Sequence, residues 1–114
     1  MLVVFTTTPG FSEGAELAEK IVDAKLAACV QIVPQITSVY FWEGSVQKDN
    51  EQLLLIKTTD EKYSELEKFI SENHTYDVPE VVAIKSANVS DPKTKRSWSF
   101  SKTLKPTSNS RTNK

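Results

Sequence analysis

Cysteine, histidine and glycine are all scarce in this chain of 114 residues, and each scarcity excludes a class of site. Cys29 is the single cysteine, so the chain has neither an internal disulfide nor a Cys-x-x-Cys pair for redox chemistry or thiolate metal transfer. His74 is the single histidine, and no Ser or Cys nucleophile motif flanks it. The three glycines show neither the GxGxxG nor the Walker spacing that cradles phosphates. We therefore expect a binding or assembly protein and no enzyme.

Long apolar runs are absent as well. The longest contain four or five residues, against the roughly 20 needed to span a bilayer. Residues 1–8 lack the basic start, the long apolar middle and the small-residue cleavage site of a secretory signal. These absences predict a protein without a membrane span, and we expect it in the cytoplasm.

Charge is divided unevenly along the chain, although the net charge is only −1. Residues 1–92 hold seven basic and all fifteen acidic residues, a net charge of −8. Such a body repels nucleic acid phosphates and attracts cations, so we expect no nucleic acid partner. Residues 93–114 hold seven basic residues, no acidic ones, and nine Ser or Thr. We expect one domain over residues 1–92, followed by a tail that is disordered or partly helical.

The first half of the domain predicts a strand, a helix and a long strand. Residues 2–5 form a short β-prone run. Ser12 stands in position to cap a helix, whose apolar residues recur at helical spacing until the chain reaches Ala28. Residues 29–42 are largely apolar, β-branched or aromatic, and Pro34 interrupts them. We expect an extended segment there with a bulge at the proline.

The second half predicts a returning strand, a second helix and a final strand. Residues 43–45 form a turn, and residues 51–58 return as a strand whose centre is unbroken by polar residues. Thr58 and Glu61 have capping-box spacing, and the amphipathic pattern after them ends near Asn73. Residues 78–84 give the last strand.

The predicted order, β-α-β-β-α-β, indicates an α+β protein of ferredoxin-like βαββαβ architecture. Right-handed crossovers place both helices on one face of a four-stranded antiparallel sheet. Because the run at residues 53–56 is apolar on both sides, the second face of the sheet is also apolar. An exposed apolar sheet of that size predicts self-association.

Four segments, in the same order relative to these elements, resemble the CutA divalent-cation-tolerance family. Residues 26–32 (Leu-Ala-Ala-Cys-Val-Gln-Ile) resemble its helix-to-strand junction, and residues 38–44 (Ser-Val-Tyr-Phe-Trp-Glu-Gly) its aromatic hairpin arm. Residues 51–58 resemble its returning strand, and residues 74–80 (His-Thr-Tyr-Asp-Val-Pro-Glu) its most distinctive loop. The resemblance implies a PII-like subunit of a tight homotrimer with hairpin arms that pair between subunits.

The resemblance also implies tolerance of copper and other divalent cations, and in some members a copper site. That site is built from a cysteine in the first strand and histidines before the Pro-containing loop. This chain has Thr6 at the cysteine position and Asn73-His74 at the position of a histidine pair. Only His74 matches. The family's closing Tyr-Leu helix is also altered, with Trp98 standing close to its expected tryptophan.

The candidate metal ligands are His74, Cys29, Asp77 and Glu80. His74 follows a helix end, where an imidazole can cap the structure or bind zinc or copper with Asp77 or Glu80 from the same loop. Cys29 lies among apolar residues, which favours a buried core position, and its alternative role is as a soft ligand for copper. No cofactor is required by this pattern.

Two further features have competing interpretations. Tyr40, Phe41 and Trp42 resemble a base-stacking platform, but the acidic body argues against nucleic acid and favours packing at a trimer interface. Lys57 ends the apolar strand, where it is either solvated or an anchor for an anionic ligand in a cleft between subunits. The sequence therefore supports two functions, a homotrimer that binds divalent metal weakly or conditionally, or a PII-like small-molecule sensor or interaction scaffold.

Overall fold

The computed structural model describes residues 1–89, and the tail predicted for residues 93–114 lies outside the described residues. Six elements follow one another in the predicted order. They are β1 (Leu2–Thr8), α1 (Phe11–Asp23), β2 (Cys29–Trp42), β3 (Ser45–Thr58), α2 (Asp60–Asn73) and β4 (Val82–Lys85). Within these residues no helix is long and apolar enough to cross a membrane.

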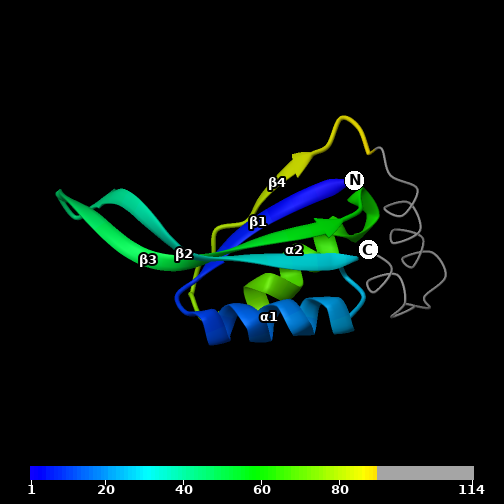
Figure 1. Ribbon diagram of the computed structural model, residues 1–114, viewed down its shortest axis with the longest axis horizontal. Coiled ribbons are helices and arrows are strands. Elements are labelled where there is room, and N and C mark those ends of the chain that lie inside the picture. The colour runs from blue at the N-terminus through cyan, green and yellow to red at the C-terminus, as the bar shows by residue number, and fades with distance from the viewer. Residues whose placement is uncertain (90–114) are drawn as a thin grey trace.

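The strands form one antiparallel sheet in the order β2-β3-β1-β4, and α1 and α2 lie on the same side of it (Figure 1). This confirms the ferredoxin-like α+β prediction. Beyond the body, β2 and β3 continue as a twisted two-stranded arm that projects away from the helices (Figure 1). The arm ends in a two-residue turn at Glu43 and Gly44, whose φ values of 49° and 83° match the turn type that closes tight hairpins.

The core lies between the sheet and the two helices. Strict alternation in β1 and β3 turns every second side chain toward the helices, where apolar residues of α1 and α2 meet them. The buried apolar residues are Leu2, Val4, Leu17, Ala18, Ile21, Leu26, Ala27, Leu54, Ile56, Leu66 and Ile70. Each fully buried Leu or Ile of this set contributes about 1.5 to 3 kcal/mol to the free energy of unfolding.

The opposite side of the sheet, which we call the helix-free face, carries the alternate residues of the same strands. Phe5 and Leu53 on this face are half-buried, whereas Val82 and Ile84 of β4 remain 45% and 54% exposed. Together with Glu80 they border a shallow recess of about 300 Å³. No described helix covers this face (Figure 1). The sequence-based expectation of a second apolar face is therefore met.

A bulge separates the body of β2 from the arm, at the predicted proline. The register shifts between Val33 and Ile36, so that β2 gains one residue relative to β3. Gln35 has a positive φ of 58° there, and its backbone N–H donates to the buried Gln52 side-chain oxygen at 3.1 Å. The Gln52 side chain thus supplies an acceptor for the Gln35 N–H where the backbone hydrogen bonds between β2 and β3 are interrupted.

The start predicted for the first helix is wrong. Gly10 is the N-cap of α1 and makes no side-chain cap bond, while Ser12 lies within the first turn and donates to Glu13.

The predicted end is also too late. The chain leaves α1 through Lys25 in a left-handed conformation (φ 62°), and the Lys25 and Leu26 N–H groups donate to the Val22 and Ile21 carbonyls. This termination buries Leu26, which is why its apolar side chain prolonged the helical pattern.

The predicted capping box at Thr58 and Glu61 is also wrong. Thr59 is the N-cap of α2, without a side-chain cap bond. Thr58 is the last residue of β3 and faces the helices, so its hydroxyl is buried and donates to the Leu26 carbonyl at 2.6 Å. The last strand begins at Val82, four residues later than predicted, and the preceding Val78 is 87% exposed.

We predict that Gln52→Leu lowers the free energy of unfolding by about 1 to 3 kcal/mol, because the Gln35 N–H loses its acceptor while the side-chain volume hardly changes. Urea unfolding of the purified protein measures this. Gln31→Leu, which replaces an exposed glutamine on the neighbouring strand β2, is the matched control and should change the value by less than about 0.5 kcal/mol. Equal effects of the two substitutions would contradict the role given to Gln52.

Candidate functional site

The loop between α2 and β4 brings His74 against the edge of β1. The imidazole is half-buried, and its Nε2 lies 2.6 Å from the Thr7 carbonyl oxygen. Its Nδ1 accepts the backbone N–H of Tyr76 at 2.9 Å. Since a carbonyl can only accept and an amide can only donate, these partners assign the neutral form protonated on Nε2. Both ring nitrogens are therefore engaged within the subunit.

The position of His74 follows from the short final strand. Within the described residues β4 pairs with β1 only from Leu2 to Phe5, so the edge of β1 continues beyond its partner. The imidazole bonds to Thr7 on this continuation, 67 residues away in sequence. A side chain thus takes the place that a strand partner would have occupied, so the imidazole contacts the edge of β1 and not the end of the preceding helix, where capping was considered.

Glu51 gathers three hydroxyl groups at the base of the arm. Tyr76 Oη donates to its Oε2 at 2.6 Å, Thr7 Oγ1 donates to the same oxygen at 3.2 Å, and Ser38 Oγ donates to Oε1 at 2.6 Å. The Tyr76 ring also stacks on His74, with centroids 4.8 Å apart. One carboxylate therefore connects the loop, β1 and both strands of the arm.

Electrostatics around this cluster keep the phenols protonated. Burial raises the pKa of Tyr76 well above its usual value, and the hydrogen bond to the Glu51 carboxylate raises it further. A second phenol, Tyr40, donates to Asp49 along the arm, and that hydrogen bond raises its pKa as well. Each of these two phenols therefore donates a hydrogen bond to a carboxylate, one along the arm and one at its base.

The predicted metal ligands are not gathered into one site in the subunit. Asp77 and Glu80 are exposed, and among residues 1–89 no group of three or more His, Cys, Asp or Glu side chains could hold a metal ion. Cys29 pairs with Lys57 of β3, which in turn pairs with Val3 of β1. His74 contacts Thr7, which lies four residues further along β1. At about 3.3 Å per residue, the thiol and the imidazole lie more than about 13 Å apart.

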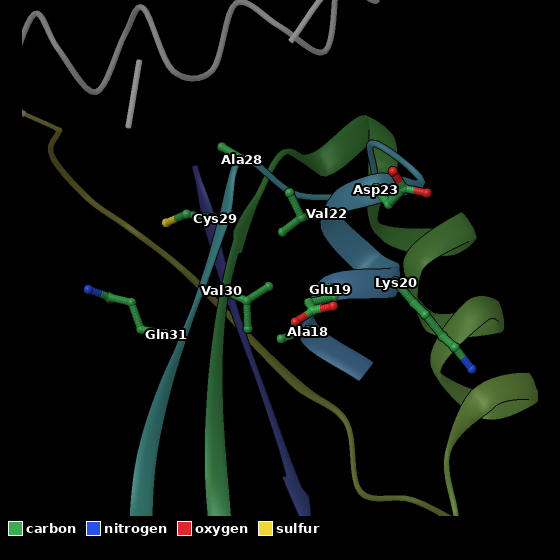
Figure 2. Close-up of a pocket in the computed structure, with 9 residues that line it drawn as sticks. All are labelled: Ala18, Glu19, Lys20, Val22, Asp23, Ala28, Cys29, Val30 and Gln31. Carbon is green, nitrogen blue, oxygen red and sulfur yellow. The ribbon is translucent and has the colours of Figure 1, made fainter. Parts of the chain in front are cut away.

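Cys29 and Lys57 form a second location at the far end of the sheet. They are direct cross-strand partners, so they share the helix-free face. Cys29 is half-buried and its sulfur points away from α1, while Val30 points toward the helix (Figure 2). The expected core position of Cys29 is therefore not found, because strand alternation gives that place to its neighbour.

An open recess of about 630 Å³ lies between α1 and the start of β2 (Figure 2). Ala18, Val22 and Val30 form its apolar wall, and Glu19 and Asp23 lie at its rim. The recess contains no nucleophile paired with a base, and its single thiol is directed away from it (Figure 2).

The three arm aromatics extend into solvent in the single subunit. Tyr40, Phe41 and Trp42 are 42%, 71% and 60% exposed. Successive side chains of a strand point to opposite faces. Tyr40 and Trp42 therefore lie on one side of the arm and Phe41 on the other.

Comparison with known proteins assigns the family. The family model described as "CutA1 divalent ion tolerance protein" matches residues 2–95, which is most of the chain. The chain belongs to this CutA family. Protein CutA, chloroplastic, of Arabidopsis thaliana is 51% identical over 90 residues, which cover 79% of this chain and 50% of that relative. The chain therefore spans about half the length of the curated plant relatives it matches.

Two further comparisons cover more of the matching chain. The divalent-cation tolerance protein CutA of Thermus thermophilus is 44% identical over 82 residues, covering 72% of this chain and 80% of that protein. The crystal structure of CutA1 from Oryza sativa superposes with a TM-score of 0.72 and 52% identity, covering 76% of this chain and 82% of that one. The structural likeness agrees with the ferredoxin-like fold described above.

The resemblance implied copper ligands, in some family members, at two positions that hold Thr6 and Asn73 in this chain. Thr6 is 2% exposed, and its hydroxyl finds no hydrogen-bond partner among the described residues. Asn73 ends α2, and its side-chain nitrogen donates to the Phe69 carbonyl at 2.9 Å. With His74 fully engaged as well, the residues of one subunit do not fit a preformed copper site.

Sequence reasoning missed the roles of Glu51, Tyr76 and Thr7. The first two stand in segments that carry the CutA resemblance, yet no spacing rule connects residues 25 positions apart. The available signal was that Glu51 is an acidic residue at the start of an apolar strand, a place where a carboxylate needs hydrogen-bond donors.

We predict that Tyr76→Phe makes the free energy of unfolding less dependent on pH in the alkaline range. The Tyr76 pKa is raised in the folded state from 10.0, so its contribution is present below pH 10 and is lost as the pH rises, because only the unfolded chain ionises there. In urea unfolding between pH 8 and pH 11, the free energy of unfolding of wild type should fall toward that of the variant as the pH rises. A difference that stays constant with pH would contradict the raised pKa.

Proposed function

We propose that the chain acts as a homotrimer that binds divalent metal ions, copper among them, weakly or conditionally, and so contributes to metal tolerance. The observation that carries this proposal is the family match over residues 2–95. The Thermus thermophilus relative is named a divalent-cation tolerance protein, which supports the same function here.

Trimer formation is supported by surfaces that one subunit leaves exposed. The helix-free face is apolar along Phe5 and Leu53, and the arm presents Phe41 and Trp42 to solvent. Exposed apolar area of this kind is typical of interfaces between subunits. Copies of the same chain would cover the face while each arm packs its aromatics against a neighbour.

We predict a mass of three subunits by light scattering, and a loss of trimer on dilution for Trp42→Ala, since truncating a buried interface aromatic costs about 3 to 5 kcal/mol. Phe11→Ala is the matched control, because Phe11 is similarly exposed (58%) but lies on α1. A wild-type monomer, or equal effects of both variants, would count against this interface.

Metal binding in this proposal centres on His74, with Asp77 and Glu80 as oxygen ligands of the same loop. Both carboxylates are exposed and therefore accessible to a cation from solvent. Cys29 lies too far away to join them in one subunit, so it would contribute only across a subunit boundary. One imidazole and two exposed carboxylates make a weak site for copper or zinc.

We predict that copper(II) binds wild type with a Kd in the micromolar range or weaker and binds His74→Ala at least about fivefold more weakly. Isothermal titration of the full chain measures both. Glu61→Gln, an exposed carboxylate on α2, serves as the control and should match wild type. Indistinguishable isotherms for wild type and His74→Ala would remove His74 from the site.

Binding and assembly, without catalysis, is the activity we propose, and we place the protein in the cytoplasm. The matching family model is described as a divalent ion tolerance protein, which supports a non-enzymatic role. The Arabidopsis thaliana relative is named chloroplastic, so a plastid is the competing compartment. Fractionation of cells that express the full-length gene distinguishes the two locations.

A small-molecule sensor is the second candidate function, favoured by the Cys29 and Lys57 pair on the helix-free face. A cation at the end of an apolar face is suited to an anionic ligand in a cleft between subunits. Thermal-shift measurements with metal chelated separate this candidate from the first, because only a sensor would be stabilised by anionic metabolites.

A further inference from the structure

His74 cannot offer a lone pair to a metal ion while its present contacts persist. In the form protonated on Nε2, only Nδ1 carries a lone pair, and the Tyr76 N–H occupies it. Coordination through Nε2 would require the proton to move to Nδ1, where it would face the same N–H donor, and Thr7 would lose its partner. Either mode of coordination therefore requires the loop to leave its position.

The loop is held by Tyr76 through three contacts of different kinds. Its backbone N–H donates to His74, its ring stacks on the imidazole at 4.8 Å, and its hydroxyl donates to Glu51 at 2.6 Å. Glu51 is fixed in turn by Ser38 and Thr7, on two different strands. The phenol contact therefore anchors the loop to the sheet at the base of the arm.

We infer that Tyr76 and Glu51 form a latch that holds His74 in its structural position and thereby sets how tightly this chain binds metal. The closed latch keeps the imidazole engaged with β1, and metal binds the minor population in which the loop has moved away. Apparent affinity then falls by the fraction of molecules that are open. The effect on affinity rests on the proposed function, whereas the latch itself does not.

The latch contact can be removed without disturbing the ring. Tyr76→Phe deletes the hydroxyl that reaches Glu51 and keeps the aromatic stack on His74. A hydrogen bond to a charged carboxylate raises the ratio of closed to open loop by about tenfold. Tyr63→Phe makes the same chemical change on α2, away from the loop, and is the matched control.

The first measurement uses no metal. In wild type, nitrogen NMR shifts should show the Nε2-protonated tautomer of His74, and the Tyr76 amide should exchange slowly with solvent. Tyr76→Phe should speed exchange of the residue 76 amide about tenfold, and Glu51→Gln should also speed it. Tyr63→Phe should leave it unchanged. Unchanged exchange in Tyr76→Phe, or another tautomer in wild type, would overturn the latch.

The second measurement is a copper(II) titration of the same full-length variants. Tyr76→Phe should bind about tenfold more tightly than wild type, and the double variant Tyr76→Phe/His74→Ala should lose that gain. Faster amide exchange without any tighter binding, while wild type still shows binding that depends on His74, would overturn the control of affinity. Faster exchange with no His74-dependent binding in any variant would support the latch and refute the proposed role of His74 in metal binding.

Discussion

Two helices can cover only one face of a four-stranded sheet, and the rest of this molecule depends on that limit. Strand alternation buries Val4 and Leu54 against the helices, and it necessarily sends Phe5 and Leu53 to the other side. The same strands that build the core therefore create a half-buried apolar surface. The core of the subunit and its uncovered apolar face therefore arise from one sequence pattern.

The order of elements could be predicted because periodicity records which side of each element is buried. The ends of elements could not, since they depend on contacts made by the backbone. Lys25 ends α1 in a left-handed conformation that usually takes glycine, so the sequence carried no stop signal. The site was harder still, because His74 bonds to a backbone carbonyl, and every residue has one.

Glu51 shows how a charge is tolerated on the helix-free face. It follows the same alternation as Leu53, so its carboxylate points to the side where apolar residues gather. Three hydroxyl donors satisfy its oxygens, and they come from β1, the arm and the loop. Solvation of one carboxylate by protein groups thus fixes three segments relative to one another, which is why the loop that carries His74 has a defined position.

The bulge decides which side of the arm these groups occupy. Before it, Val33 pairs with Leu53 on the helix-free face; after it, Ile36 pairs with Glu51, so three residues of β2 match two of β3. Without the extra residue, Ser38 would turn to the opposite side and could not donate to Glu51. Tyr40 would turn with it, away from the helix-free face. One inserted residue therefore places the polar cluster and an arm aromatic on the same side as the helix-free face.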